Sequence, residues 1–366
     1  MQPPEERLDV SSELRIAILW QCWTGYLDAG LQALMEARTS RALIIQRAPH
    51  PEAPLDVARL PAARTAEHAL YQDGFEALAA RTEALRPNLI LVNSWAHPTY
   101  RRLSRRWKGR AVRAMHMDNQ WYGTVKQWGG IVASPFLVRP ITDYAFVPGD
   151  RQARFARRLG FPRHRIVCPS LTGNTRVFAP MASRPLHERK AFLFVARVAP
   201  EKGVDLLVDA YRAYRARTND PWPLIVCGTG RLAHLLDGVE GVDARGFVQP
   251  GDLPPVFGEA ACMVLPSLFE PYAVALHEAA IAGLGIICSE ACGAADDFVD
   301  SERVNGRVVP TGDAAALTEA MLAMSRRSPE ELEAVRTRSI ELASRISPER
   351  WAQTLLELVD RGPPGR

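Results

Sequence analysis

Short strand-like apolar runs alternate with helix-like amphipathic stretches along the first half of the chain. The predicted strands are Ile16–Trp20, Ala42–Gln46, Leu89–Asn93, Ala111–His116, Tyr144–Pro148 and Arg165–Pro169. Alternation of this kind is typical of a parallel sheet that helices cover.

The second half repeats the scheme. Residues 191–210 run from a buried-strand pattern through a polar turn into an amphipathic helix, and later strand-like runs lead to Gly228, Ser267 and Ser289. The 366 residues are enough for two domains. We therefore predict an α/β protein with two Rossmann-like, doubly wound domains that face each other across a cleft. The expected domains are residues 1–183 and 188–346, with a linker within 180–189.

Two acids stand out in the stretch that follows Ser267. Glu270 precedes a predicted helix, and Glu278 is the only acid between Pro271 and Ser289, where nearly every helix face is apolar. A buried carboxylate is unfavourable unless it is paired or hydrogen-bonded, and sugar or ribose hydroxyls can donate such bonds. The alternative, that Glu278 reaches water or an internal arginine, stays open from the helix alone.

Arg197 and Lys202 bracket the strand-to-helix turn of the second half. Ligands of open α/β sheets bind at the carboxyl ends of strands, and the next helix offers free N–H groups to a phosphate. Lys202 is one of only four lysines in the chain. An ordinary solvated turn is the alternative, but together with Glu270 and Glu278 the two cations favour a pyrophosphate ligand.

Further motifs follow in a fixed order over residues 190–325. The series consists of Arg197, Glu201-Lys202-Gly203, Gly228-Thr229-Gly230, Gly246-Phe247-Val248, Pro266-Ser267, Glu270-Pro271, Glu278-Ala279 and Asn305-Gly306. Because these motifs occur in this order, the chain resembles the retaining, nucleotide-sugar-dependent glycosyltransferases of family 4. Those enzymes have the two-domain GT-B fold. The resemblance implies an acceptor-side first domain, a donor-binding second domain, and a carboxyl-terminal helix, about residues 347–366, that crosses back to the first domain.

The resemblance also implies roles for individual residues. Arg197 and Lys202 would bind the donor pyrophosphate, Glu270 the transferred sugar, and Glu278 the ribose hydroxyls. Backbone groups complete the expected donor site, at Gly25, Gly228, Phe247, Val248, Tyr272, Ala273 and Val274. In many members of the family a glycine stands where this chain has Ala273, so the identity of the sugar stays open.

The first half offers two candidate sites. His116 ends a predicted strand and should point toward the cleft, where the resemblance implies a histidine near the donor sugar, and Asp118 and Asn119 follow it. Trp23 and Tyr26 lie in the loop after the first strand, where they form either a platform for a sugar acceptor or a packed aromatic cluster. The expected catalytic residues are His116, Arg197, Lys202 and Glu270. The expected acceptor-binding residues are Trp23, Tyr26, Asp118 and Asn119.

Positive charge gathers in the first half, where residues 1–187 hold 26 Lys and Arg against 15 Asp and Glu. A cluster of bases lies in a stretch with no acid between residues 84 and 117, at Arg101, Arg102, Arg105, Arg106 and Lys108. Such a cluster can bind an anionic membrane surface or steer an anionic acceptor, and a solvated helix face explains it equally well. No nucleic-acid-binding fold accompanies the charge.

Together these patterns predict an enzyme that moves a sugar from a nucleoside-diphosphate sugar to an acceptor hydroxyl with retention. The acceptor could be a glycan, a lipid-linked molecule or a small molecule. Neither a metal nor a further cofactor is expected, because the sequence holds no compact ligand cluster. Without a leader pattern or an apolar run long enough to span a bilayer, we expect a cytoplasmic protein, or one peripheral on the inner face of the membrane. The alternatives are an epimerase or phosphorylase of the same fold, and a non-catalytic sugar-nucleotide-binding subunit.

Overall fold

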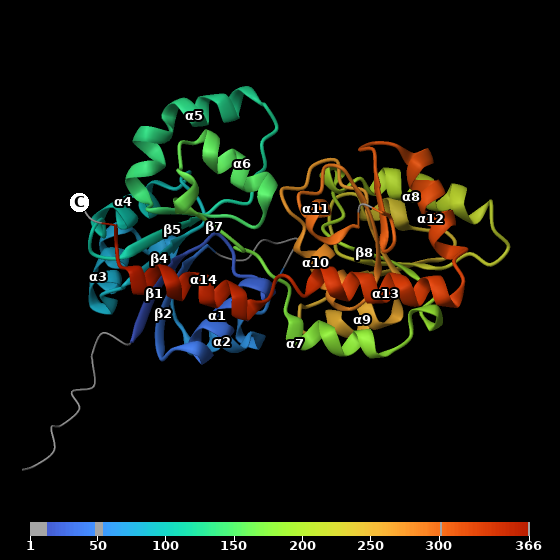
Figure 1. The fold of residues 1–366 in the computed structure, drawn as a ribbon, viewed down its shortest axis with the longest axis horizontal. Coiled ribbons are helices and arrows are strands. Elements are labelled where there is room, and N and C mark those ends of the chain that lie inside the picture. The colour runs from blue at the N-terminus through green and yellow to red at the C-terminus, as the bar shows by residue number, and fades with distance from the viewer. Residues whose placement is uncertain (1–12, 48–53, 301, 365–366) are drawn as a thin grey trace, which may run out of the picture.

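A computed structural model of the chain describes residues 13–47, 54–300 and 302–364. The chain forms two halves that lie side by side, each built around one sheet (Figure 1). The expectation about an amino-terminal leader falls largely on residues 1–12, outside the described residues. None of the helices within the described ranges is long and apolar enough to cross a membrane.

The first half contains a seven-stranded parallel sheet with the strand order β3-β2-β1-β4-β5-β6-β7. Its strands are β1 Leu14–Leu19, β2 Ser40–Gln46, β3 Glu67–Leu70, β4 Leu89–Val92, β5 Val112–His116, β6 Tyr144–Phe146 and β7 Ile166–Val167. All six predicted strands are present. The edge strand β3 was not predicted, because its four residues include no Val, Ile, Thr, Phe, Tyr or Trp and only Ala69 is buried.

Helices cover both faces of this sheet, as expected. They are α1 Gly25–Ala37, α2 Pro61–Thr65, α3 Phe75–Leu85, α4 Pro98–Arg106, α5 Val125–Leu137 and α6 Asp150–Arg158. Alternate residues of β1 enter different cores: Ile16 and Ile18 pack with α1, whereas Ala17 and Leu19 pack with α3 and α4. This alternation follows from the two-residue period of a strand.

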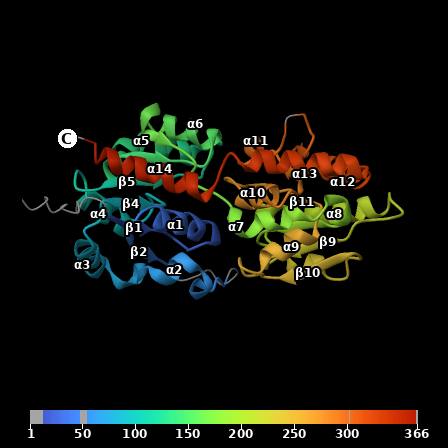
Figure 2. The ribbon, with the colours of Figure 1, turned by 60° about the horizontal axis from the view of Figure 1, so that its bottom comes forward.

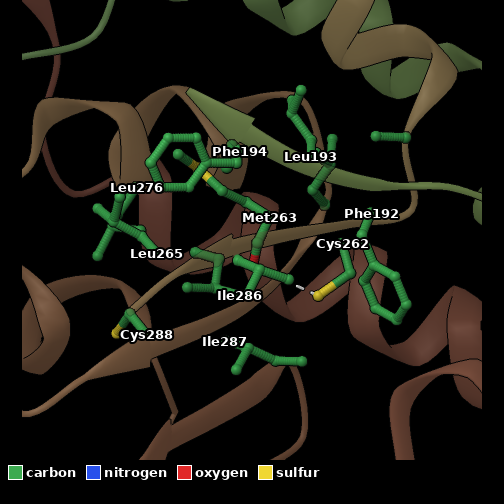
Figure 3. Close-up of a cluster of buried hydrophobic side chains, with 14 of the residues drawn as sticks. Phe192, Leu193, Phe194, Cys262, Met263, Leu265, Leu276, Ile286, Ile287 and Cys288 are labelled. Carbon is green, nitrogen blue, oxygen red and sulfur yellow. Dashed lines mark hydrogen bonds between the residues drawn. The ribbon is translucent and has the colours of Figure 1, made fainter. Parts of the chain in front are cut away.

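The second half contains a six-stranded parallel sheet with the order β10-β9-β8-β11-β12-β13. Its strands are β8 Phe192–Val195, β9 Leu224–Cys227, β10 Val242–Gly246, β11 Cys262–Leu265, β12 Gly285–Ser289 and β13 Gly306–Val309. Its helices are α7 Thr175–Phe178, α8 Val204–Arg215, α9 Leu253–Glu259, α10 Val274–Ile281, α11 Ala295–Phe298, α12 Ala314–Ser325 and α13 Pro329–Ala343. Figure 3 shows part of the core, where Phe192, Met263 and Ile286 lie on adjacent strands. The two sheets confirm the predicted fold class.

The last helix, α14 Pro348–Arg361, returns to the first half (Figure 2). Trp351 and Leu355 are buried in the first core. The Trp351 ring lies so close to α1 that a Cβ atom on Gly30 would stand 2.9 Å from it. The crossing helix is therefore confirmed, and it ties the two halves together through apolar packing.

The segment expected as a linker, residues 180–189, packs onto the second half. Leu186 belongs to the second core, as does Phe178 just before the segment, and the buried Arg189 guanidinium donates to the backbone oxygen of Ala282 at 3.0 Å. Two short 3-10 helices, Ala179–Ser183 and Leu186–Glu188, give this segment a fixed course. It is therefore not a free connection between the halves.

Candidate active site

The carboxyl edges of the two sheets face each other where the halves meet. Gln120, in the loop after β5, donates to the backbone oxygen of Ala291, in the loop after β12, at 2.8 Å. Gly25 follows β1 and lies against Pro250, so close that a Cβ atom on it would stand 2.9 Å from the proline. Ligands of open α/β sheets bind outside these edges, where the strand order reverses. The reversal lies between β1 and β4 in the first sheet and between β8 and β11 in the second.

Two charged loops meet at the reversal point of the second sheet. The loop after β8 carries Arg197 and Lys202, and the loop after β11 carries Glu270. The Nζ atom of Lys202 lies 2.5 Å from Oε2 of Glu270, and both side chains are mostly buried. Arg197 lies 2.6 Å from Glu201 and is more exposed. The structure thus brings Lys202 and Glu270 together as a buried ion pair, and it places Arg197 on the same loop as Lys202.

Glycines allow these loops to pack backbone against backbone. Gly203 has φ +67°, and a Cβ atom on it would stand 2.3 Å from the carbonyl oxygen of Pro266. At Gly228 an added Cβ atom would stand 1.8 Å from the carbonyl oxygen of Ala196, beside Arg197. The Gly228 turn therefore fixes the position of the cationic loop.

The residues after Glu270 turn sharply into α10. Ala273 precedes the helix with φ +82° and ψ +77°, a left-handed conformation that an L-residue rarely adopts. The first amides of a helix have no partner inside it, and in the described part of the chain we find no hydrogen bond from the amides of Tyr272, Ala273 or Val274. The Tyr272 ring points away from this edge, because it is buried 6.5 Å from the ring of Phe298. Only the backbone of Tyr272 can therefore meet a ligand here.

Glu278 borders a cavity of about 270 Å³ between the two halves. Phe247 contributes to the same wall, whereas Val248 is half-buried against the second core. Burial raises the pKa of the Glu278 carboxyl to about 7. Within the residues that the structure describes, no protein group donates a hydrogen bond to this carboxylate. It is therefore open to a hydroxyl donor in the cavity.

Trp23 and Tyr26 line this same cavity from the first half. The indole N–H of Trp23 donates to Asp28 at 3.2 Å, and the ring is buried in the first core. Burial raises the pKa of Tyr26 to about 12, and the charges of Glu278 and Glu270 act in the same direction. The structure thus groups the two aromatics with the expected donor residues rather than with His116.

His116 lies at the end of β5 in a second cavity of about 440 Å³, together with Asp118 and Asn119. Its Nδ1 atom lies 2.9 Å from the hydroxyl of Ser170, and burial lowers its pKa, so the ring is neutral near pH 7. Aromatic side chains complete the walls of this cavity, namely Trp95, Tyr122, Phe155 and Phe269. A polar floor with aromatic walls is suited to sugar hydroxyls and ring faces.

One residue that holds the site together was missed from the sequence. Gln152, on α6, donates to the backbone oxygen of Pro271 at 2.6 Å and so ties the first half to the Glu270 loop. Its position, two residues after the start of α6, carries no motif. Only the contact between the halves reveals its role.

The comparisons agree with this architecture. Residues 189–327 match the family model described as Glycosyl transferases group 1. Over 95% of this chain and 99% of its own, the structure of Anabaena HepE in complex with UDP and glucose superposes with a TM-score of 0.72 at 15% identity. The fold is therefore the two-domain GT-B fold of glycosyltransferases.

Similar sequences include two glycosyltransferases that are named for the biosynthesis of colanic acid and of amylovoran. One is the putative colanic acid biosynthesis glycosyltransferase WcaL of Escherichia coli, 25% identical over 52% of this chain and 50% of that protein. The other is the amylovoran biosynthesis glycosyltransferase AmsK of Erwinia amylovora, 26% identical over 48% of this chain and 46% of that protein. Each match thus spans half or less of the relative's own length.

Proposed function

We propose that this protein is a retaining glycosyltransferase that moves a sugar from a nucleoside-diphosphate sugar to an acceptor hydroxyl in glycan biosynthesis. The observation that carries the proposal is the convergence of Lys202, Glu270 and the start of α10 at the strand-order reversal of the second sheet. Glu278 faces an adjacent cavity. The match of residues 189–327 to the group 1 model and the names of the similar proteins support it.

The cations and amides of the site would hold the donor diphosphate. The ammonium of Lys202 and the guanidinium of Arg197 would stabilise the negative charge that develops on the departing diphosphate. The unbonded amides at the start of α10 add the positive end of the helix dipole. These groups supply the electrostatic role that a divalent ion has in other enzymes, so we propose transfer without a metal.

The acids would hold the carbohydrate parts of the donor. Glu278 would accept hydrogen bonds from the ribose hydroxyls, and its raised pKa fits a carboxylate that lacks donors until the ligand arrives. Glu270 would release Lys202 to the diphosphate and bind hydroxyls of the sugar. Because the motifs place no nucleophile beneath the sugar, we propose front-face attack, in which the leaving phosphate takes the acceptor proton. His116, which is neutral and lines the second cavity, would orient the sugar.

Donor binding and transfer test the proposal directly. UDP-glucose and a panel of other nucleoside-diphosphate sugars are added to the purified protein, and the melting temperature and the release of nucleoside diphosphate are measured, with and without EDTA. We expect at least one donor to raise the melting temperature and to be turned over equally in EDTA. Lys202→Ala and Glu278→Ala should each weaken donor binding at least about tenfold, which corresponds to about 1.4 kcal/mol.

Matched controls separate the site from general charge effects. Lys190→Ala and Glu319→Ala change exposed members of surface ion pairs and should leave donor binding unchanged. If Lys202→Ala and Glu278→Ala also leave it unchanged, the pyrophosphate and ribose assignments are wrong. If a donor binds and the chain neither hydrolyses nor transfers it, a non-catalytic binding subunit is the better description.

A further inference from the structure

The helix α5 exposes an apolar stripe along its length. Val125, Trp128, Val132 and Phe136 recur at intervals that place them on one helix face, and their exposed fractions are 89%, 54%, 76% and 74%. With Leu137 they make up five of the ten most exposed large hydrophobic side chains in the described part of the protein. Exposed apolar residues normally scatter singly, so a concentration of this kind marks an interaction surface.

The stripe belongs to a helix that the first half holds at a few points, and Ser134 is its one buried residue. Thr124 caps its first turn, and the hydroxyl of Ser134 donates to the backbone oxygen of Leu159 at 2.7 Å. The ring of Trp128 meets the ring of Trp121 edge-on at 5.3 Å. In Figure 1, α5 lies at the outer edge of the first half, away from its central sheet. The apolar face therefore points outward from the first half.

Cations surround the stripe and acids are missing from it. No Asp or Glu occurs from residue 119 to residue 142. Lys126 lies in the first turn of α5, Arg139 follows its end, and both are exposed. Arg105, from α4, donates to the backbone oxygen of Phe136 at 2.9 Å and so joins the basic side chains of α4 to this face.

Three other arginines of the predicted basic cluster are less available than Arg105, whereas Lys108 is exposed beyond the end of α4. Arg106 pairs with Glu83 at 2.8 Å, and the Arg102 guanidinium lies 3.6 Å from the centre of the Phe75 ring. Arg101 donates to the backbone oxygen of Trp95 at 2.9 Å. The stronger surface is therefore the stripe of α5 with Arg105, Lys126 and Arg139 at its borders.

We propose that this face of α5 docks on an anionic lipid membrane. An amphipathic helix with an apolar face and bordering cations binds at the level of the headgroups, through apolar burial and attraction to anionic lipids. A second copy of the chain fits less well, because a symmetric pair would bring the same cations together without an acid between residues 119 and 142 to neutralise them. A nucleic acid would leave the apolar side chains without a partner.

Docking in this way places the His116 cavity beside the bilayer. Lys126, Gln127 and Gly130 of α5 line that cavity, so it lies next to the helix that carries the stripe. A lipid-linked acceptor in the membrane could thus reach the cavity without leaving the headgroup region. This consequence rests on the proposed function, whereas the docking itself does not.

Vesicle binding tests the docking. The full chain is sedimented with vesicles of phosphatidylcholine alone and with vesicles that also contain phosphatidylglycerol, at low and at raised salt. We expect binding to the anionic vesicles that weakens at raised salt. Val132→Asp combined with Phe136→Asp should lower the partition coefficient at least about tenfold.

Two controls make the result specific to α5. Leu70→Asp combined with Val308→Asp changes two exposed apolar residues elsewhere and should leave vesicle binding intact. With brominated lipid in the vesicles, tryptophan emission should be quenched, and Trp128→Phe should remove most of that quenching while the protein still binds. Equal binding to neutral and anionic vesicles, or full binding by the Val132→Asp, Phe136→Asp variant, would overturn the proposal.

The oligomeric state and donor binding complete the test. In the absence of vesicles the chain should sediment as a monomer, and a dimer that the α5 double variant dissociates would show that a second copy covers the stripe. UDP-glucose should stabilise the double variant as much as the unchanged protein. If no sugar nucleotide binds while vesicle binding behaves as expected, the proposed function fails and the docking stands.

Discussion

Ala273 offers a direct test of how backbone conformation shapes the donor loop. It adopts φ +82° immediately before α10, and the left-handed region is unfavourable for an L-residue by roughly 1–2 kcal/mol. Glycine adopts this region freely but loses about 0.5–1 kcal/mol more through backbone entropy on folding. The difference predicts that Ala273→Gly stabilises the protein by roughly 0.5–1 kcal/mol and raises its melting temperature by about 1–4 °C.

A second alanine provides the control. Ala66 is also half-buried and ends a helix, but its φ of −84° is ordinary. Ala66→Gly should therefore lower the free energy of unfolding by about 0.5–1 kcal/mol. Both variants are compared with the unchanged protein by thermal unfolding. If Ala273→Gly lowers the melting temperature as Ala66→Gly does, then no strain is stored at the start of α10.

Two further predictions concern Glu278 and Gly203. Because burial raises the pKa of Glu278 from 4.5 to about 7, the folded protein keeps a proton that the unfolded chain releases, and stability falls as the pH rises through this interval. Glu278→Gln should remove that fall. When the free energy of unfolding is measured across this pH range, the variant should become more stable than the unchanged protein toward high pH, by up to roughly 3 kcal/mol. Parallel curves of stability against pH for the two proteins would contradict this. Gly203→Ala should lose roughly 2–4 kcal/mol, because its Cβ atom would stand 2.3 Å from the Pro266 carbonyl. Gly312→Ala, with φ +85° and no atom within 4 Å, should lose only about 1–2 kcal/mol, and equal unfolding shifts for the two would argue against the close packing.

Much of the architecture could be predicted because buried parallel strands leave short apolar runs in the sequence. The strands that end at His116 and at Ser289 were placed correctly for this reason. The strand β3 was missed because an edge strand buries little and needs few β-forming residues. The contact between Lys202 and Glu270 could be anticipated, because the two residues follow β8 and β11. These strands lie on either side of the strand-order reversal in the second sheet.

Features that depend on three-dimensional packing could not be predicted. An apolar residue such as Val132 is typical of a core, and only the structure shows that it faces outward. The arginines of α4 read as one patch, although the structure pairs Arg106 with Glu83. The sequence around Ala273 does not indicate its left-handed conformation. The one hint is that many members of the resembled family have a glycine at this position.

A crystal structure of the protein with UDP-glucose would show directly which residues hold the donor. We expect the diphosphate to lie within hydrogen-bonding distance of Lys202 and of the first amides of α10, with the ribose hydroxyls on Glu278 and the sugar beside Glu270. A ligand bound elsewhere, or a complex in which Lys202 keeps its contact with Glu270 and touches no phosphate, would contradict it.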